Sequence, residues 1–434
     1  MKVGFVSLGC SKNLVDTEMC IGLFKKHSFE VVPKPEEADI IVVNTCGFIE
    51  SAKEEAINTI LEMSEYKQTG NCKYLIAMGC LVKRYKQDLE KSIPEVDLWI
   101  SLDEYDMLWL KVEKLLKRDK PKNDLLDYLD RTITTGDTTA YLKIAEGCSN
   151  YCTYCAIPMI RGKFVSRPLE EVINEAKSLV EKGIKEIIII AQDTTKYGID
   201  LYGESKLAEL LQRLEKIAEL KWIRFLYAYP ESISEELIEV VKNSKKICHY
   251  FDMPIQHISN SILKRMNRKT TGERVEKLIN HIREEIPDVI LRTSLIVGFP
   301  GETVEDFEKL YNFVKKINFD KLGVFAYSKE EGTPAAILEG QIHFATKKVR
   351  RNKIMSLQQE ISKEVLKEKI GNTYQALIEN ITMDGKYYMA RTYMDVPDMD
   401  GVCWIKNTKE LEIGQFVNCK IIDVMDYDLI GEVI

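Results

Sequence analysis

The sequence of 434 residues has no long apolar run, and none of its runs approaches the roughly 18 residues of a membrane span. It has only five histidines, with no pair at zinc-ligand spacing. Positive charge is not in excess either, because the net charge is −7, which argues against indiscriminate nucleic-acid binding. Internal repeats beyond strand–helix alternation and low-complexity tracts are absent. These absences predict a cytoplasmic protein that has no contact with a membrane. The length predicts two or three domains, and the composition of 45% hydrophobic and 30% charged residues predicts a globular protein.

Cysteine, in contrast, is plentiful. The chain has eleven, at positions 10, 20, 46, 72, 80, 148, 152, 155, 248, 403 and 419. In a reducing compartment such a set indicates metal binding or catalysis rather than disulfides. Because the histidines are scattered, the hypothesis to test is ligation by thiolates alone.

Apolar runs alternate with helical stretches along most of the chain. In the first hundred residues the strand-like runs are Val3–Leu8, Asp39–Asn44, Tyr74–Met78 and Leu98–Ile100. Continuous apolar runs are typical of parallel strands that are buried on both faces. Six further strand-like segments follow, at Tyr141–Ala145, Glu186–Ala191, Trp222–Tyr229, Tyr250–Ile255, Val289–Val297 and Leu322–Tyr327. Successive strand–helix units of this kind predict a partial α/β barrel with its chemistry at the carboxyl ends of the strands.

The predicted fold class is therefore α/β, in five segments. Residues 1–118 form an N-terminal parallel α/β domain, 119–139 a linker, and 140–340 a (β/α)6 partial TIM-like barrel. Residues 341–369 form a connecting helix. Residues 370–434 change to short β-prone runs separated by turn residues, which predict a small antiparallel β-barrel of about five strands.

The strongest motif is "EGCSNYCTYC", which places Cys148, Cys152 and Cys155 on one loop after the first barrel strand. Three thiolates at this spacing hold three irons of a 4Fe–4S cluster and leave the fourth iron without a protein ligand. The alternative is a structural zinc site. Zinc normally has a fourth Cys or His ligand, and none stands at a typical spacing here.

With this motif the chain resembles the radical S-adenosylmethionine superfamily, and Tyr154 fits the aromatic position before the third cysteine. The resemblance implies that the open iron chelates S-adenosylmethionine, which one electron cleaves to methionine and a 5′-deoxyadenosyl radical. It also implies cofactor contacts in three later segments. They are Gln192 and Asp193 in "AQDTTKYG", Gln256 in "DMPIQH", and Arg292 with the Val297 backbone in "LRTSLIVGFPGET". For each of these residues, strand-end packing or helix capping is the open alternative.

A second set of cysteines is spread along the N-terminal domain. Cys10, Cys46 and Cys80 each end a predicted strand, at separations close to one strand–helix unit. Regular parallel connections bring such positions to one edge of the sheet. Free cysteines are often buried as small apolar residues, which remains the alternative. Three strand-end thiols in succession favour a second cluster.

Two cysteine triads, a barrel and a small β-domain resemble the radical S-adenosylmethionine methylthiotransferases, with a C-terminal TRAM domain. The resemblance implies two 4Fe–4S clusters, S-adenosylmethionine, an electron donor such as flavodoxin or ferredoxin, and no catalytic side chain beyond the clusters. "GFVSLGCSKNLVDTE", "QDTTKYG" and "DMDGVCWIK" look like the RimO branch, which modifies the β-carbon of an aspartate in ribosomal protein S-twelve. Other members modify adenosines in tRNA, and this is the alternative function.

Charge offers a separate criterion for the substrate. Residues 370–434 hold eleven Asp and Glu against five Lys and Arg, a net charge of −6. Such a domain repels phosphate and attracts a basic ribosomal protein, so tRNA is disfavoured as a partner. An acidic solubilising surface is the plainer interpretation. A non-catalytic iron–sulfur protein that binds RNA is a further alternative from another class.

Overall fold

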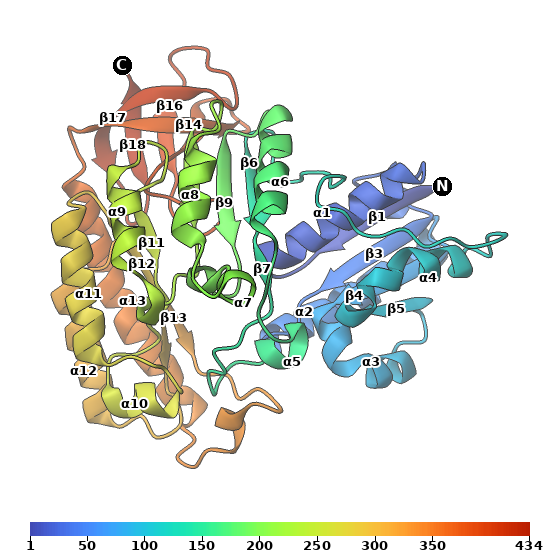
Figure 1. Ribbon diagram of the computed structural model, residues 1–434, viewed down its shortest axis with the longest axis horizontal. Coiled ribbons are helices and arrows are strands. Elements are labelled where there is room, and N and C mark those ends of the chain that lie inside the picture. Colours follow the sequence, from blue (N-terminus) through green and yellow to red (C-terminus); the bar gives the residue numbers. More distant parts are fainter.

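The computed structural model describes residues 1–434, and their N-terminal part is a five-stranded parallel sheet in the order β2-β1-β3-β4-β5 (Figure 1). The strands are β1 (Lys2–Ser7), β2 (Glu30–Val31), β3 (Ile40–Thr45), β4 (Tyr74–Gly79) and β5 (Leu98–Ser101). The helices are α1 (Ser11–Lys26), α2 (Glu50–Thr69), α3 (Cys80–Ser92) and α4 (Leu108–Leu115), with 3₁₀ turns at Pro35–Glu37 and Leu102–Met107. Strand β3 is wholly buried, as its continuous apolar run predicted.

Six parallel strands form the centre of the molecule. They are β6 (Thr139–Lys143), β9 (Glu186–Ile190), β10 (Trp222–Phe225), β11 (Tyr250–Asp252), β12 (Ile290–Val297) and β13 (Lys321–Ala326). This confirms the predicted six-unit partial barrel, with one difference. The hydrogen-bonded sheet divides into β10-β9-β6 and β11-β12-β13. The predicted strand Trp222–Tyr229 ends early because Tyr227 has a left-handed backbone conformation, with φ +60°.

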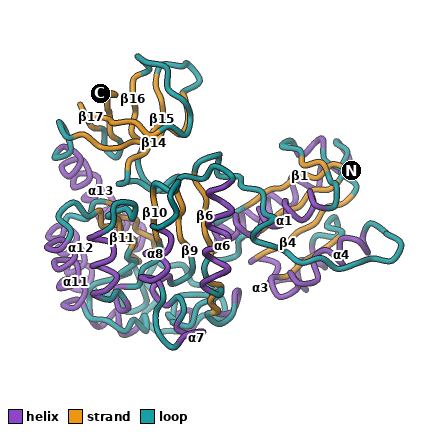
Figure 2. The backbone as a smooth tube through the Cα atoms, turned by 45° about the horizontal axis from the view of Figure 1, so that its top comes forward, coloured by secondary structure: helices purple, strands orange, loops and turns teal.

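Helices cover the outer side of these strands (Figure 2). They are α6 (Leu169–Glu181), α7 (Ile199–Tyr202), α8 (Leu207–Glu215), α9 (Glu235–Asn243), α10 (Asn260–Arg265), α11 (Gly272–Glu285) and α12 (Val304–Ile317). The 3₁₀ turns η3, η4 and η5 span Thr194–Lys196, Pro230–Ser232 and Pro334–Ile337. After β6 the chain first forms a small hairpin, β7 (Ala145–Glu146) and β8 (Val165–Ser166), which encloses α5 (Ile157–Arg161).

The C-terminal part is a closed five-stranded barrel reached through the long helix α13 (Phe344–Lys367). Its strands are β14 (Thr373–Ile381), β15 (Tyr387–Thr392), β16 (Cys403–Lys406), β17 (Phe416–Val424) and β18 (Leu429–Val433). The predicted barrel is confirmed, but it is not antiparallel throughout. Strand β18 lies between β16 and β17, so β16 and β18 pair in parallel.

This small barrel packs against the amino-terminal end of the central strands. Lys321, the first residue of β13, forms an ion pair with Asp395 at 2.6 Å. The Tyr250 hydroxyl, at the start of β11, donates to Asp400 at 2.6 Å. The opposite, carboxyl end of the strands is therefore left to the cysteine loop. No helix of the chain is long and apolar enough to cross a membrane.

Candidate functional site

The first candidate centre is the loop between β7 and α5, near the carboxyl end of β6. It carries Cys148, Cys152 and Cys155, of which the first two are buried. The loop is fixed to the far side of the barrel, because the Thr153 N–H donates to the Met266 carbonyl at 3.1 Å. The structure thus brings the three thiols to one place beside the ends of the strands.

Burial disfavours the charged thiolate form of these cysteines when no metal is bound. Burial raises the pKa of Cys148 to about 11 and that of Cys155 to about 12, and the neighbouring Cys152 contributes to both shifts. Coordination to iron removes this penalty by stabilising the charged thiolate. Three soft donors, without a fourth on the same loop, fit a 4Fe–4S cluster that has one open iron.

Two predicted cofactor contacts follow β9. Gln192 Nε2 donates to Glu146 Oε1 at 3.1 Å, and the buried Gln192 Oε1 has no partner. Asp193 is buried and accepts hydrogen bonds from the Thr195 N–H at 3.1 Å and from Asn150 Nδ2 at 2.7 Å. Asp193 therefore caps a 3₁₀ turn and ties it to the cysteine loop, whereas Gln192 retains an unused acceptor. Their contact with S-adenosylmethionine stays a prediction.

Three more predicted contacts lie toward the carboxyl end of the barrel, one on the cysteine loop and two on strands or their continuations. Tyr154 packs on an apolar cluster that includes Phe299 and Tyr327, and its buried hydroxyl has no partner. Gln256 continues β11 through a bridge to β12, with φ +69°. Val297 ends β12, and its carbonyl accepts from the Tyr327 N–H at 2.9 Å. All three lie at the same end of the barrel as the cysteine loop.

Arg292 is placed differently from these residues. It is the third residue of β12, and its Nη1 donates to Asp252 Oδ1 at 2.7 Å. Its Nε lies 3.6 Å from Asp400 Oδ1 of the C-terminal barrel. The guanidinium is thus engaged with the segment that covers the amino-terminal end of the strands. Its contact with the cofactor stays a prediction, and the ion pairs indicate a structural role.

The second candidate centre lies at the carboxyl edge of the N-terminal sheet. Cys10 precedes α1, Cys46 follows β3, and Cys80 begins α3. The loops approach so closely that a Cβ on Gly9, which has φ +86°, would lie 2.8 Å from Cys46 Sγ. Burial raises the pKa of Cys46 and raises that of Cys80 to about 12, and a thiolate at Cys10 adds to both. The structure therefore brings these three thiols together as well.

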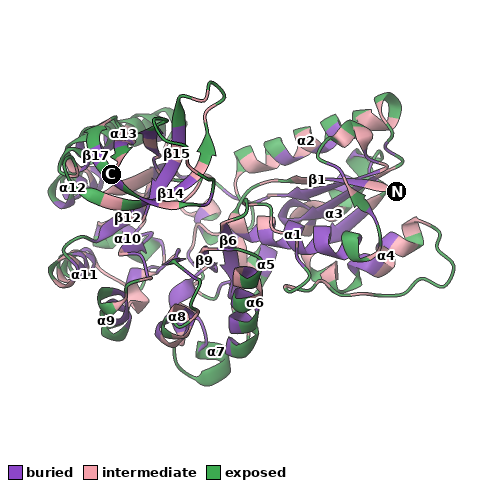
Figure 3. Cartoon of the chain, turned by 90° about the horizontal axis from the view of Figure 1, so that it is seen from above, coloured by how far each residue is buried: buried purple, intermediate pink, exposed green.

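Helix α1 connects this centre to the central barrel through an unusual buried polar face. Figure 3 shows α1 buried along most of its length, between the N-terminal sheet and β6, whereas α2 is largely exposed. Five polar side chains of α1 are each at most 6% exposed; they are Lys12, Asn13, Asp16, Thr17 and Glu18. Buried polar groups of this density require partners, and the barrel supplies many of them.

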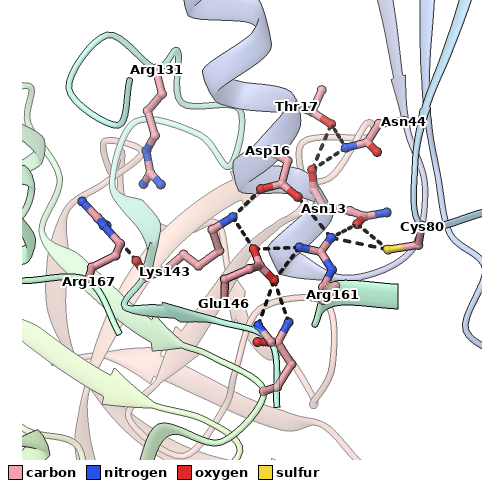
Figure 4. A network of polar contacts seen from close by, with 12 residues as sticks. Asn13, Asp16, Thr17, Asn44, Cys80, Arg131, Lys143, Glu146, Arg161 and Arg167 are labelled. Carbon is pink, nitrogen blue, oxygen red and sulfur yellow. Dashed lines mark hydrogen bonds and ion pairs between the residues drawn. The ribbon is translucent and has the colours of Figure 1, made fainter. Parts of the chain in front are cut away.

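Arg161 at the end of α5 joins the two centres (Figure 4). Its Nη1 donates to both Glu146 carboxylate oxygens, at 2.9 and 3.0 Å. Its Nη2 donates to Asp16 Oδ2 at 3.1 Å and to Asn13 Oδ1, and it lies 3.5 Å from Cys80 Sγ. The Arg161 side chain is only 2% exposed. The sequence prediction missed this residue, and its only signal there is its place six residues after Cys155.

A second contact between the two domains is made by the loop after β13. Its Glu330 carboxylate is buried and lies 3.2 Å from Arg84 Nη1 and 3.3 Å from Lys53 Nζ. The Glu50 N–H donates to it at 3.1 Å. Because α2 and α3 supply these partners, the loop fastens the carboxyl end of the barrel to the N-terminal domain.

No three His, Cys, Asp or Glu side chains converge as the ligands of a single metal ion would. The thiolates of a 4Fe–4S cluster bind different irons and stand farther apart. The residues at both centres fit such a cluster by donor type. Cys80, Cys148 and Cys152 are buried, Cys46 and Cys155 are partly buried, Cys10 is exposed, and the backbone approaches closely at Gly9.

Known family models match three parts of the chain. The radical SAM superfamily matches residues 142–314, and the TRAM domain matches residues 370–434. Residues 2–101 match an uncharacterized protein family, UPF0004.

Full-length relatives decide the family. A protein of Alkaliphilus oremlandii named ribosomal protein uS12 methylthiotransferase RimO is 62% identical over 433 residues, covering 100% of this chain and 99% of its own length. A Clostridioides difficile protein of the same name is 50% identical over 444 residues, with coverage of 100% and 99%. This chain belongs to the RimO family. The predicted RimO branch and radical S-adenosylmethionine enzyme class are thereby confirmed, and the cofactors of this chemistry are 4Fe–4S clusters and S-adenosylmethionine.

A solved structure shares the fold of this chain at low sequence identity. The radical S-adenosylmethionine methyltransferase TsrM from Kitasatospora setae superposes with a TM-score of 0.58 at 13% identity, covering 77% of each chain. At this identity the likeness extends to the fold alone.

Proposed function

We propose that this protein transfers a methylthio group to the β-carbon of an aspartate in ribosomal protein uS12. The observation that carries the proposal is full-length similarity, at 50% identity and above, to relatives named for uS12 methylthiotransfer. The two cysteine triads, which are joined through Arg161, support it.

We assign one 4Fe–4S cluster to Cys148, Cys152 and Cys155, and a second to the N-terminal triad of Cys10, Cys46 and Cys80. A 4Fe–4S cluster held by Cys148, Cys152 and Cys155 would supply the electron for the cleavage of S-adenosylmethionine, which is the chemistry that removes hydrogen from an unreactive carbon. Residues 1–118 and 140–340 hold the two triads, 119–139 and 341–369 connect the parts, and 370–434 cover the amino-terminal end of the barrel.

The chain's own residues orient these centres. Helix α1 and Arg161 fix the N-terminal triad against the barrel, and Glu330 fastens the other side of the same junction. The buried Gln192 Oε1 and Tyr154 hydroxyl, both without partners, are available to hydrogen-bond a bound cofactor. The partners that we assign are uS12, free or in the small ribosomal subunit, and an electron donor such as flavodoxin or ferredoxin, in the cytoplasm.

Mass spectrometry of substrates tests this function. The anaerobically reconstituted protein is incubated with reductant, S-adenosylmethionine, a sulfur source and either uS12 or unmodified tRNA. We expect one methylthio group on a uS12 aspartate and none on tRNA. Methylthioadenosine in tRNA with an unchanged uS12 peptide would contradict the proposal and favour the tRNA alternative.

Iron content tests the assignment of the two triads. The protein should bind about eight irons. Joint replacement of Cys10, Cys46 and Cys80 by alanine should leave about four, and should abolish methylthio transfer while deoxyadenosine formation continues. Iron that does not change in this variant would exclude the N-terminal cluster.

A further inference from the structure

Arg161 follows the cysteine loop of the barrel and contacts a cysteine of the N-terminal triad. It ends α5, which begins two residues after Cys155. Its Nη2 points to Cys80 Sγ at 3.5 Å, within the range of an N–H···S hydrogen bond. Cys80 also donates weakly to Asn13 Oδ1 at 3.4 Å. Figure 4 shows the guanidinium between Cys80 on one side and Glu146 on the other.

Two carboxylates hold this guanidinium in place. Asp16 from α1 and Glu146 from β7 contact Nη2 and Nη1, respectively, and Gln192 in turn donates to Glu146. Lys143 also binds both carboxylates. The planar fork of arginine engages separate acceptors with separate nitrogens, which the point charge of a lysine does not do. The direction of Nη2 toward Cys80 is therefore set by the barrel as well as by α1.

We propose that Arg161 is a positioning residue that holds Cys80 toward the barrel and raises the reduction potential of the N-terminal cluster. The inference rests on the proposed function, because it requires a cluster at Cys10, Cys46 and Cys80. One-electron reduction adds a negative charge to such a cluster. Hydrogen bonds and positive charge at its sulfurs stabilise that charge, and the low dielectric around the buried Arg161 and Cys80 strengthens both effects.

The same interface contains a matched control. Arg131 is also buried; its Nη1 lies 3.1 Å from Glu175 Oε1, and its Nε lies 3.7 Å from Glu18 Oε2 of α1. It fastens α1 to the barrel as Arg161 does, but no thiol is among its hydrogen-bond and ion-pair partners. A variant at Arg131 therefore measures the effect of a loosened α1, without any loss of a donor to sulfur.

The test is an anaerobic redox titration followed by electron paramagnetic resonance. The full chain carries Cys148, Cys152 and Cys155 replaced by alanine, so that only the N-terminal cluster contributes to the signal. In this background, Arg161→Met should lower the reduced-to-oxidised ratio at a fixed potential about tenfold, which equals about 59 mV for a one-electron couple. Arg161→Lys should produce a smaller shift, because it keeps the charge. Arg131→Met should leave the potential unchanged.

Three results would overturn the inference. The first is an unchanged potential in Arg161→Met that retains its full iron, and the second is an equal shift in Arg131→Met. The third applies if Arg161→Met does not bind iron, and it is an unchanged potential in Arg161→Lys. If the chain with Arg161 intact binds no iron at its N-terminal triad, the result contradicts the proposed function itself. The two failures are thus distinguishable.

Discussion

At the scale of single residues, the geometry of the N-terminal triad depends on the neighbouring backbone as well as on the thiols. Gly9 has φ +86°, and a Cβ there would lie 2.6 Å from Cys46 Cβ. We expect Gly9→Ala to displace Cys46 and to lower bound iron from about eight toward about four per chain, with deoxyadenosine formation retained.

Iron analysis checks the Gly9 prediction against a matched variant. Gly371 has the same φ of +86°, with no atom within 4 Å of an added Cβ. Gly371→Ala therefore carries the backbone strain without the clash, and it should keep its full iron. Full iron in Gly9→Ala would contradict the expected close packing of Cys46.

His257 gives a prediction for pH dependence. The ring is fully buried, its Nδ1 accepts from the Ser259 N–H at 3.0 Å, and Nε2 has no partner. Burial lowers its pKa to about 3, an effect that Asp306 opposes and Arg350 reinforces. Below about pH 6.5 the unfolded chain binds a proton that the folded chain excludes, so stability falls as pH falls from 6.5 toward 3.

Urea unfolding measures this contribution of His257. Between pH 7.5 and 5.5 the histidine should account for about 1.4 kcal/mol of the lost free energy of unfolding. His257→Asn keeps an acceptor for the Ser259 N–H. Its free energy of unfolding should fall by about 1.4 kcal/mol less than that of the unmodified chain between pH 7.5 and 5.5. The same pH dependence in both proteins would show that His257 is protonated in the folded state.

At the scale of elements, the sequence predicted strands and cysteine loops well and the contacts between domains poorly. Apolar runs located the four longer N-terminal strands and all six central ones to within a few residues. The two-residue edge strand β2 was missed because it is too short to produce a pattern. Arg161 and Asp16 are 145 residues apart, and no local signal reports such a contact. "SKNLVDTE" was informative only through resemblance, and the structure gives its polar residues a physical role as buried contacts.

The loop after β13 is an element whose position depends on one carboxylate. Glu330→Gln removes the charge that Arg84 and Lys53 share, and it leaves both cations only partly compensated in a buried site. We expect the free energy of unfolding to fall by about 3 kcal/mol and cleavage by protease within residues 328–343 to accelerate.

Glu331→Gln is the control for the loop prediction. Glu331 is exposed, and its carboxylate only accepts from the Tyr85 hydroxyl at 3.4 Å. Its replacement should change stability by about 1 kcal/mol or less. Equal effects at both positions would show that the buried ion pairs do not fasten the loop.

At the scale of the whole molecule, the acidic charge of the C-terminal barrel is partly used inside the protein. Asp395 pairs with Lys321, and Asp400 contacts Tyr250 and Arg292, all in the central barrel. The net charge of residues 370–434 therefore overstates what is available to a partner. A charge count from sequence cannot detect this, because it treats every ionised side chain as exposed. The substrate assignment consequently rests on family relationship more than on charge.

The interface between the C-terminal and central barrels contains a buried network of charged side chains. Arg391 of β15 donates to Glu186 of β9 at 2.5 Å and to Glu379 at 2.7 Å, and Arg224 lies 3.1 Å from Glu186. Arg391→Met leaves the Glu186 carboxylate buried with one partner fewer. We expect a loss of about 3–5 kcal/mol in the free energy of unfolding, measured in urea.

Lys386 provides a control for Arg391, and the distance of Arg391 from the cysteine triads predicts its effect on iron. Lys386, at the exposed start of the same hairpin, pairs only with Asp384 at 3.3 Å, so Lys386→Met should change stability by about 1 kcal/mol or less. Both cysteine triads lie toward the carboxyl ends of their strands, whereas Glu186 begins β9. Iron content in Arg391→Met should therefore equal that of the unmodified chain under native conditions. Iron loss without a fall in unfolding free energy would mean that the small barrel acts on the metal centres directly, contrary to its position at the opposite end of the strands.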